Sequence, residues 1–138
     1  MRAPLIAALV LALAAAPAAA QPSASATAAA KPGTAQRRAI LAALRPTIAL
    51  ELRSPVEFVV RDLRVEQGWA LVIADPQRPG GGAIDGRHLP YFDDRDGLTV
   101  YALLRFGGGR WRLHDHVIGP TDVWYCGVEG PPASLLRC

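Results

Sequence analysis

The sequence predicts an α+β domain in which one amino-terminal helix, kinked at a proline, packs on a four-stranded antiparallel sheet made of two hairpins. Two observations support this prediction. In residues 35–54, apolar side chains recur every three to four positions, as they do on one face of a helix. After residue 55 the pattern changes to two pairs of β-rich segments, and a glycine turn separates the members of each pair.

The first 20 residues are typical of a secretory signal peptide. Arg2 supplies the positive start, residues 5–16 form an unbroken apolar run, and small residues at 18–20 suit cleavage. The run is shorter than the roughly 20 residues that span a bilayer, so we expect no stable membrane insertion after cleavage. The expected location is therefore the periplasm or the medium.

Behind the signal peptide, composition separates a linker from a folded region. Residues 21–33 consist mostly of small residues with two prolines and are interpreted as a low-complexity linker. Residues 34–138 are of the size of one domain with one core. This region is expected to fold as a single α+β domain.

Charge and composition exclude several functions. The full chain has a formal net charge of +3, and its basic residues are scattered rather than interleaved with aromatic side chains. Nucleic-acid binding is therefore not expected. Gly80, Gly81 and Gly82 are not followed by the Lys-Ser or Lys-Thr of a phosphate-binding loop. We expect no cofactor.

The helix is expected to begin at Ala35, where the Thr34 hydroxyl can cap the first turn. The apolar stripe and the opposite basic face then follow the helical period: Ile40, Leu41, Leu44, Ile48 and Leu52 against Arg37, Arg38 and Arg45. Pro46 lies inside this stretch and removes a backbone donor. The sequence predicts either a kink there or two short helices.

The first hairpin is predicted from residues 56–65 and the WALVIAD segment that follows the Gly68 turn. Val56, Phe58 and Val60 share one face of a strand, whereas Leu63 and Val65 have the opposite parity. A bulge near Arg61 and Asp62 would return all five to the core. The WALVIAD segment is apolar on both faces, which predicts a central strand.

The second hairpin is predicted from residues 98–106 and 110–118, joined by three glycines. The loop between the hairpins, residues 75–97, is long enough to suggest a functional or mobile segment. Its Tyr91 and Phe92 make it a candidate surface for a partner.

The order helix, hairpin, hairpin resembles the cystatin-like folds, including domains similar to nuclear transport factor 2, over residues 34–118 in topology only. The string GRWRLHDHVIGPTDVWY, with the preceding DGLTVYALLR, resembles small uncharacterised exported bacterial proteins. That resemblance implies no known activity. The fold resemblance implies a pocket between helix and sheet, in which an Asp–His pair would be able to do acid–base work.

The His-x-His pair on the last predicted strand has two interpretations. Alternate side chains of a strand share a face, so His114 and His116 would be able to reach one metal ion, with His88 as one possible third ligand. The favoured interpretation is a solvated face, with the other parity directed to the core. These two sets are Arg110, Arg112, His114 and His116, and Trp111, Leu113 and Val117. Asp115 does not fit, because it shares the core parity.

The predicted function is an exported, non-catalytic domain that binds a small ligand or an envelope protein. The candidate binding residues are Arg112, His114, His116, Asp122 and Trp124. One alternative is a small pocket enzyme that uses Asp115 or Asp122 with one of the histidines. The other is a metal-binding protein that uses the His-x-His strand. No catalytic residue and no metal ligand is assigned.

Cys126 and Cys138 are expected to form an intramolecular disulfide, because they are the only cysteines of a chain expected to be exported. The bridge would hold residues 131–136 against the sheet. The alternative is a Cys138 that pairs between molecules or stays reduced. A turn or short helix, capped by Thr121 or Asp122, is expected before Cys126.

Overall fold

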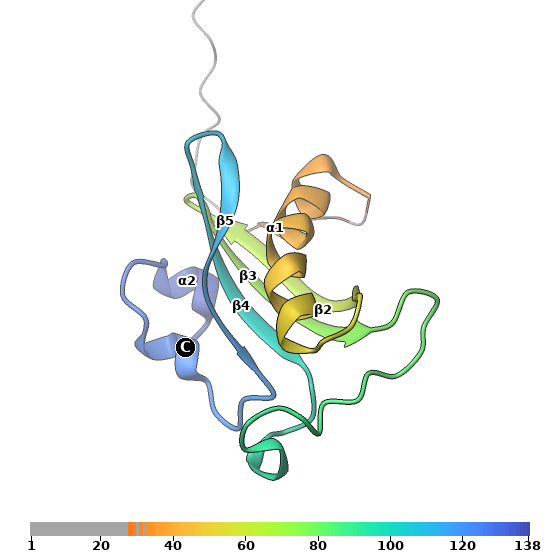
Figure 1. The fold of residues 1–138 in the computed structure, drawn as a ribbon. Coiled ribbons are helices and arrows are strands. Elements are labelled where there is room, and N and C mark those ends of the chain that lie inside the picture. The colour runs from red at the N-terminus through yellow and green to blue at the C-terminus, as the bar shows by residue number, and fades with distance from the viewer. Residues whose placement is uncertain (1–27, 30, 32) are drawn as a thin grey trace, which may run out of the picture.

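The computed structural model describes residues 28–29, 31 and 33–138. The predicted signal peptide and most of the predicted linker lie outside these residues. Helix α1 packs against an antiparallel sheet with strand order β1-β2-β3-β4-β5 (Figure 1). Four strands are long, and β1 has two residues: β1 Ala28–Ala29, β2 Glu57–Glu66, β3 Trp69–Gln77, β4 Val100–Gly107 and β5 Arg110–Ile118. The predicted arrangement of one helix on a four-stranded antiparallel sheet is confirmed.

Helix α1 spans Ala35–Glu51 and begins where the sequence predicted. The Thr34 hydroxyl accepts a hydrogen bond of 3.2 Å from the backbone N–H of Arg37, which caps the first turn. Pro46 lies within a single continuous helix, so the alternative of two short helices is wrong. The predicted apolar stripe faces the sheet, with Ile40, Leu44 and Ile48 fully buried.

The two faces of the sheet pack against different partners. We call the side covered by α1 the helix face and the opposite side the second face. Strand β3 is central, as predicted, and alternates between them. Its Ala70, Val72 and Ala74 join the core under α1, whereas Trp69 and Leu71 join a separate cluster on the second face.

Strand β2 contains the predicted bulge. Its register with β3 shifts between Val60 and Asp62, which leaves Arg61 as the additional residue. Phe58 and Val60 before the bulge, and Leu63 after it, therefore pack on the same core under α1. Strand β1 pairs with the other edge of β2, so Ala28 and Ala29 of the predicted linker belong to the sheet.

Strand β5 contains a second bulge, which the sequence analysis did not predict. Leu103 pairs with Asp115 and Leu104 with Leu113, so His114 is the additional residue. The parity of side chains therefore reverses after position 114. The prediction that Val117 faces the core under α1 is wrong, because it pairs with Tyr101 of the second face. The same reversal explains Asp115, which is exposed and not in the core.

A carboxyl-terminal segment covers the middle of the second face, on the side away from α1 (Figure 1). It contains the 3-10 helix η2 (Trp124–Gly127) and the short helix α2 (Ala133–Leu136). The predicted disulfide joins Cys126 to Cys138, with Cα atoms 5.8 Å apart. The predicted cap is wrong: Val123, and neither Thr121 nor Asp122, occupies the cap position of η2, and its side chain makes no capping hydrogen bond.

Candidate functional site

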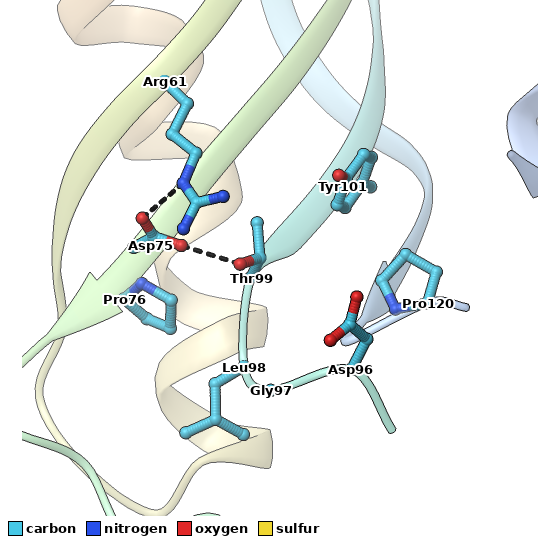
Figure 2. Close-up of a pocket in the computed structure, with 9 residues that line it drawn as sticks. All are labelled: Arg61, Asp75, Pro76, Asp96, Gly97, Leu98, Thr99, Tyr101 and Pro120. Carbon is cyan, nitrogen blue, oxygen red and sulfur yellow. Dashed lines mark hydrogen bonds and ion pairs between the residues drawn. The ribbon is translucent and has the colours of Figure 1, made fainter. Parts of the chain in front are cut away.

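A polar pocket of about 430 Å³ lies on the second face, at the end of the sheet where the long loop returns to β4 (Figure 2). Helix α1 runs behind the strands that carry these side chains. The lining comes from β2, β3, β4, the loop before β4 and the turn after β5: Arg61, Asp75, Pro76, Asp96, Gly97, Leu98, Thr99, Tyr101 and Pro120. Four segments that are distant in the sequence thus meet at one place.

One wall of the pocket is an ordered polar network around Asp75. Arg61 Nε lies 2.6 Å from Asp75 Oδ2, and the Thr99 hydroxyl donates a hydrogen bond of 2.7 Å to Asp75 Oδ1 (Figure 2). Arg61 is the bulged residue of β2, and bulges commonly redirect a side chain in this way. Both carboxylate oxygens of Asp75 are therefore engaged, while most of the Arg61 side chain stays open to solvent.

The opposite wall carries groups that are not engaged. Asp96 makes no side-chain hydrogen bond or ion pair within the described residues, and its carboxylate points toward Tyr101 and Pro120 (Figure 2). Its backbone is held, because the Asp96 N–H donates to the Gly119 carbonyl at 3.0 Å. The Tyr101 ring stacks on Tyr125, with centroids 6.1 Å apart, so the carboxyl-terminal segment fixes the aromatic part of the wall.

Gly119 is required for this geometry. Its φ of 62° lies in the left-handed region, and a Cβ at this position would lie 2.2 Å from the Gly97 carbonyl oxygen. The turn after β5 can therefore pack directly against the loop that carries Asp96. Any larger residue would push the two pocket walls apart.

The residues of the pocket combine a fixed Arg–Asp–Thr network with an unpaired carboxylate and a phenol. Such a set can accept hydrogen bonds from an amine or hydroxyl at Asp96 and donate from the exposed guanidinium of Arg61. The lining is mainly polar, so a polar small molecule fits it better than an apolar one.

None of the candidate binding residues predicted from the sequence lines this pocket. Arg112 and His114 lie on β5 and are exposed. Asp122 is exposed just before η2, and Trp124 packs against Tyr125 with ring centroids 5.9 Å apart. The indole Nε1 of Trp124 is buried and has no hydrogen-bond partner among the described residues.

The two histidines of the His-x-His pair face opposite sides of the sheet, so the prediction of a shared face is wrong. His114 meets the edge of Trp69 on the second face, with ring centroids 4.9 Å apart. His116 Nε2 lies 2.6 Å from Glu51 Oε1 at the end of α1. The bulge at His114 is the reason, because it reverses the alternation on which the prediction depended.

The proposed third ligand, His88, also lies beside the end of α1. Its Nε2 is 2.8 Å from the Glu51 carbonyl oxygen. His88 and His116 thus approach the same residue from two elements. In the described part of the chain, however, no group of three His, Cys, Asp or Glu side chains is arranged to hold a metal ion.

A smaller pocket of about 210 Å³ lies near the end of α1 and includes Arg53, Asp85 and His88. Hydrogen bonds from the side chain and backbone of Arg87 hold the pKa of Asp85 well below its usual range. The pair is solvent-exposed, so its contribution to folding is small.

The residues that form the polar pocket were not predicted from the sequence. Two features of the sequence pointed to this region, namely the predicted bulge at Arg61 and the long loop. Neither feature identifies Asp75 or Asp96 as a member of a binding site.

Comparison of the chain with family models, curated proteins and solved structures finds no match. Among the residues that the structure describes, no helix has the length and apolar character needed to cross a membrane.

Proposed function

We propose that the protein is an exported, non-catalytic domain that binds a small polar ligand in the pocket on its second face. The observation that carries this proposal is the Asp96 carboxylate, which is held in place by its backbone and faces the pocket without a partner among the described residues. A carboxylate in this position is available to a ligand rather than to the fold.

The chemistry of the lining favours a ligand that carries an amine and hydroxyl groups. An ammonium group beside Asp96 would make a charge-assisted hydrogen bond, which is stronger than a neutral one. Hydroxyl groups can pair with the phenol of Tyr101 and with the exposed part of Arg61. An amino sugar has all of these groups and is of the size that a pocket of about 430 Å³ accepts.

Export is supported by the amino-terminal sequence pattern and is compatible with the disulfide. Structural disulfides persist mainly in oxidising compartments, and Cys126–Cys138 closes the segment that follows Tyr125, whose ring stacks on the pocket residue Tyr101. Mass spectrometry of the protein from its native cells is expected to find a new amino terminus near residue 21. An intact Met1 on cytosolic protein would contradict export.

The likeness to cystatin-like domains belongs to this proposal as well. It rests on one helix lying across an antiparallel sheet. A mainly apolar pocket of about 630 Å³ lies between α1 and the β4–β5 hairpin, whereas the polar pocket lies on the face away from α1. Ligand binding is proposed in the polar pocket, because its lining includes the Asp96 carboxylate that has no partner among the described residues.

The test is a titration followed by NMR, with glucosamine and N-acetylglucosamine as matched probes. Glucosamine is expected to move the backbone signals of Asp96, Thr99 and Tyr101 in a saturable way, and acetylation of its amine is expected to weaken binding. Asp96→Asn should reduce the affinity about tenfold, which corresponds to the loss of one charge-assisted hydrogen bond. Asp93→Asn, an exposed change in the same loop, is the control.

Two outcomes would overturn the assignment of the pocket. One is that neither sugar moves the pocket signals at concentrations that saturate a millimolar site. The other is that Asp93→Asn weakens binding as much as Asp96→Asn, which would indicate non-specific attraction to an acidic loop.

A further inference from the structure

A second site is indicated at the other end of the second face, beside the two hairpin turns. One row of side chains crosses all four long strands there, because Glu66 pairs with Trp69, Trp69 with Arg105, and Arg105 with Arg112. Glu66 accepts a hydrogen bond of 2.7 Å from the Ser134 hydroxyl. The last two residues of the row, Arg105 and Arg112, lie directly opposite each other on neighbouring strands.

Two like charges directly opposite each other destabilise a sheet unless something neutralises them. Among the described residues, neither Arg105 nor Arg112 forms an ion pair. All aspartates and glutamates of the chain follow position 50 and lie within the described residues, so none is left elsewhere to provide the missing charge. Arg105 and Arg112 therefore lie opposite each other on neighbouring strands without a neutralising ion pair among the described residues.

Arg105 is held in a fixed position. Its guanidinium lies over the Trp69 ring, 5.0 Å from the centroid, and it donates a hydrogen bond of 2.9 Å to the Gln67 carbonyl. Trp69 is itself buried. A guanidinium that is already fixed loses less side-chain entropy when it binds a ligand, so Arg105 is arranged for binding rather than for solvation.

His114 adds a third group to the same place. It shares the second face with Arg112, and its ring meets the edge of Trp69 there at a centroid distance of 4.9 Å. Its ring nitrogens make no hydrogen bond within the described residues. Without the bulge, His114 would still share the second face with Arg112, but Asp115 would face the helix side. With the bulge, Asp115 lies next to His114 on the second face.

We propose that Arg105, Arg112 and His114 form a binding site for a phosphate monoester group. Arginine forks match the paired oxygens of a phosphate, and two opposed forks with an imidazole suit a tetrahedral dianion better than a single flat carboxylate. The site is separate from the polar pocket, because the segment that contains η2 and α2 covers the sheet between them. Its ligand is therefore independent of the ligand proposed above.

The direct test is a titration of the purified protein with inorganic phosphate, compared with chloride at equal ionic strength. Phosphate is expected to move the side-chain signals of Arg105, Arg112 and His114 in a saturable way. Arg112→Gln should weaken binding about tenfold or more, because it removes a charged hydrogen-bonding fork. Arg53→Gln removes the same charge at the end of α1 and should change the affinity less than twofold. Equal effects of the two variants, or no saturable change, would overturn the proposal.

Thermal unfolding provides a readout that does not depend on NMR. Because the two arginines repel each other, Arg112→Gln is expected to raise the melting temperature in chloride. Phosphate should raise the melting temperature of the unchanged protein by mass action and should raise that of the Arg112→Gln variant by less at the same concentration. A variant that melts lower than the unchanged protein, or that keeps the full response to phosphate, would contradict the site.

Two further probes distinguish a soluble phosphomonoester from a lipid headgroup as the ligand. Glycerol 3-phosphate represents soluble phosphomonoesters, and phosphatidylcholine vesicles with and without phosphatidic acid represent a membrane surface. Binding of glycerol 3-phosphate that is lost in Arg112→Gln would identify a soluble ligand. Arg112-dependent binding only to the vesicles with phosphatidic acid would identify a lipid headgroup. Binding of neither probe would overturn the proposed ligand class.

Discussion

The two faces of the sheet are held by different means. Among the described residues, the core under α1 contains 14 buried hydrophobic residues, whereas the cluster on the second face contains six. The helix face carries the larger apolar cluster, with a polar contact between His116 and Glu51 at the end of α1. The second face is apolar only in the middle, where the carboxyl-terminal segment lies, and is polar or charged at both ends.

The second face compensates for its small apolar cluster with a covalent bond and polar contacts. The disulfide closes the covering segment, and two buried charged residues of β2 hold α2. Arg64 donates a hydrogen bond to the Leu135 carbonyl, and Glu66 accepts one from Ser134. Arg64 Nε also lies 2.9 Å from Asp62 Oδ2, although its geometry is not that of a hydrogen bond. A small cover held in this way leaves both ends of the face open for ligands.

The largest effect is expected on the helix face. Leu44→Ala removes a fully buried side chain from the core and should lower the free energy of unfolding by about 4 kcal/mol. Leu50→Ala, on the same helix with the side chain 79% exposed, should change it by less than about 0.5 kcal/mol. Urea denaturation measures both. Similar losses for the two variants would contradict the orientation of α1.

Loss of the disulfide should have a somewhat smaller effect, and it should act on the second face. Replacing both Cys126 and Cys138 by serine opens a loop with a sequence separation of 12, which should cost roughly 3 kcal/mol in the chain-entropy model. Hydrogen exchange should rise first in residues 124–136, while the amides of α1 stay protected. If α1 lost protection to the same extent, the two faces would not be independent.

A still smaller loss is expected when the polar contact to α2 is removed. Ser134→Ala deletes the hydroxyl that donates to Glu66 and should lower the free energy of unfolding by about 1 kcal/mol. Ser54→Ala is the matched control, since within the described part of the chain its hydroxyl bonds only to the adjacent Pro55 carbonyl. Chemical denaturation of the two variants should separate them, and equal stabilities would mean that the contact contributes nothing.

The same division between the faces explains what could be predicted from the sequence. The stripe of α1 and the bulge at Arg61 were predictable, because burial against one continuous core imposes a period on the sequence. The second face has no such period. Its pocket brings together Arg61, Asp75 and Thr99. Asp75 contacts Arg61 across 14 positions and Thr99 across 24, and contacts over such distances cannot be predicted from the local sequence pattern.

The bulge in β5 shows where the strand pattern failed. Asp115 carried the visible signal, because a carboxylate stood at a position of core parity. A buried charge without a partner is too costly to be an ordinary core residue, so an inserted residue was the physical alternative. Which residue was inserted depends on the pairing with Leu103 and Leu104, and that pairing is set by the whole sheet.

The smallest effects are expected from substitutions that each act on only one of the two histidines beside Asp115. Glu51→Gln weakens the contact with His116, which is partly exposed, and should cost less than about 1 kcal/mol. In NMR spectra it should move the ring signals of His116 and leave those of His114 in place, whereas Trp69→Phe should do the reverse. If one substitution moved both rings together, the histidines would share a face. The bulge would then be absent, and Asp115 would face the helix side instead of lying beside His114 on the second face.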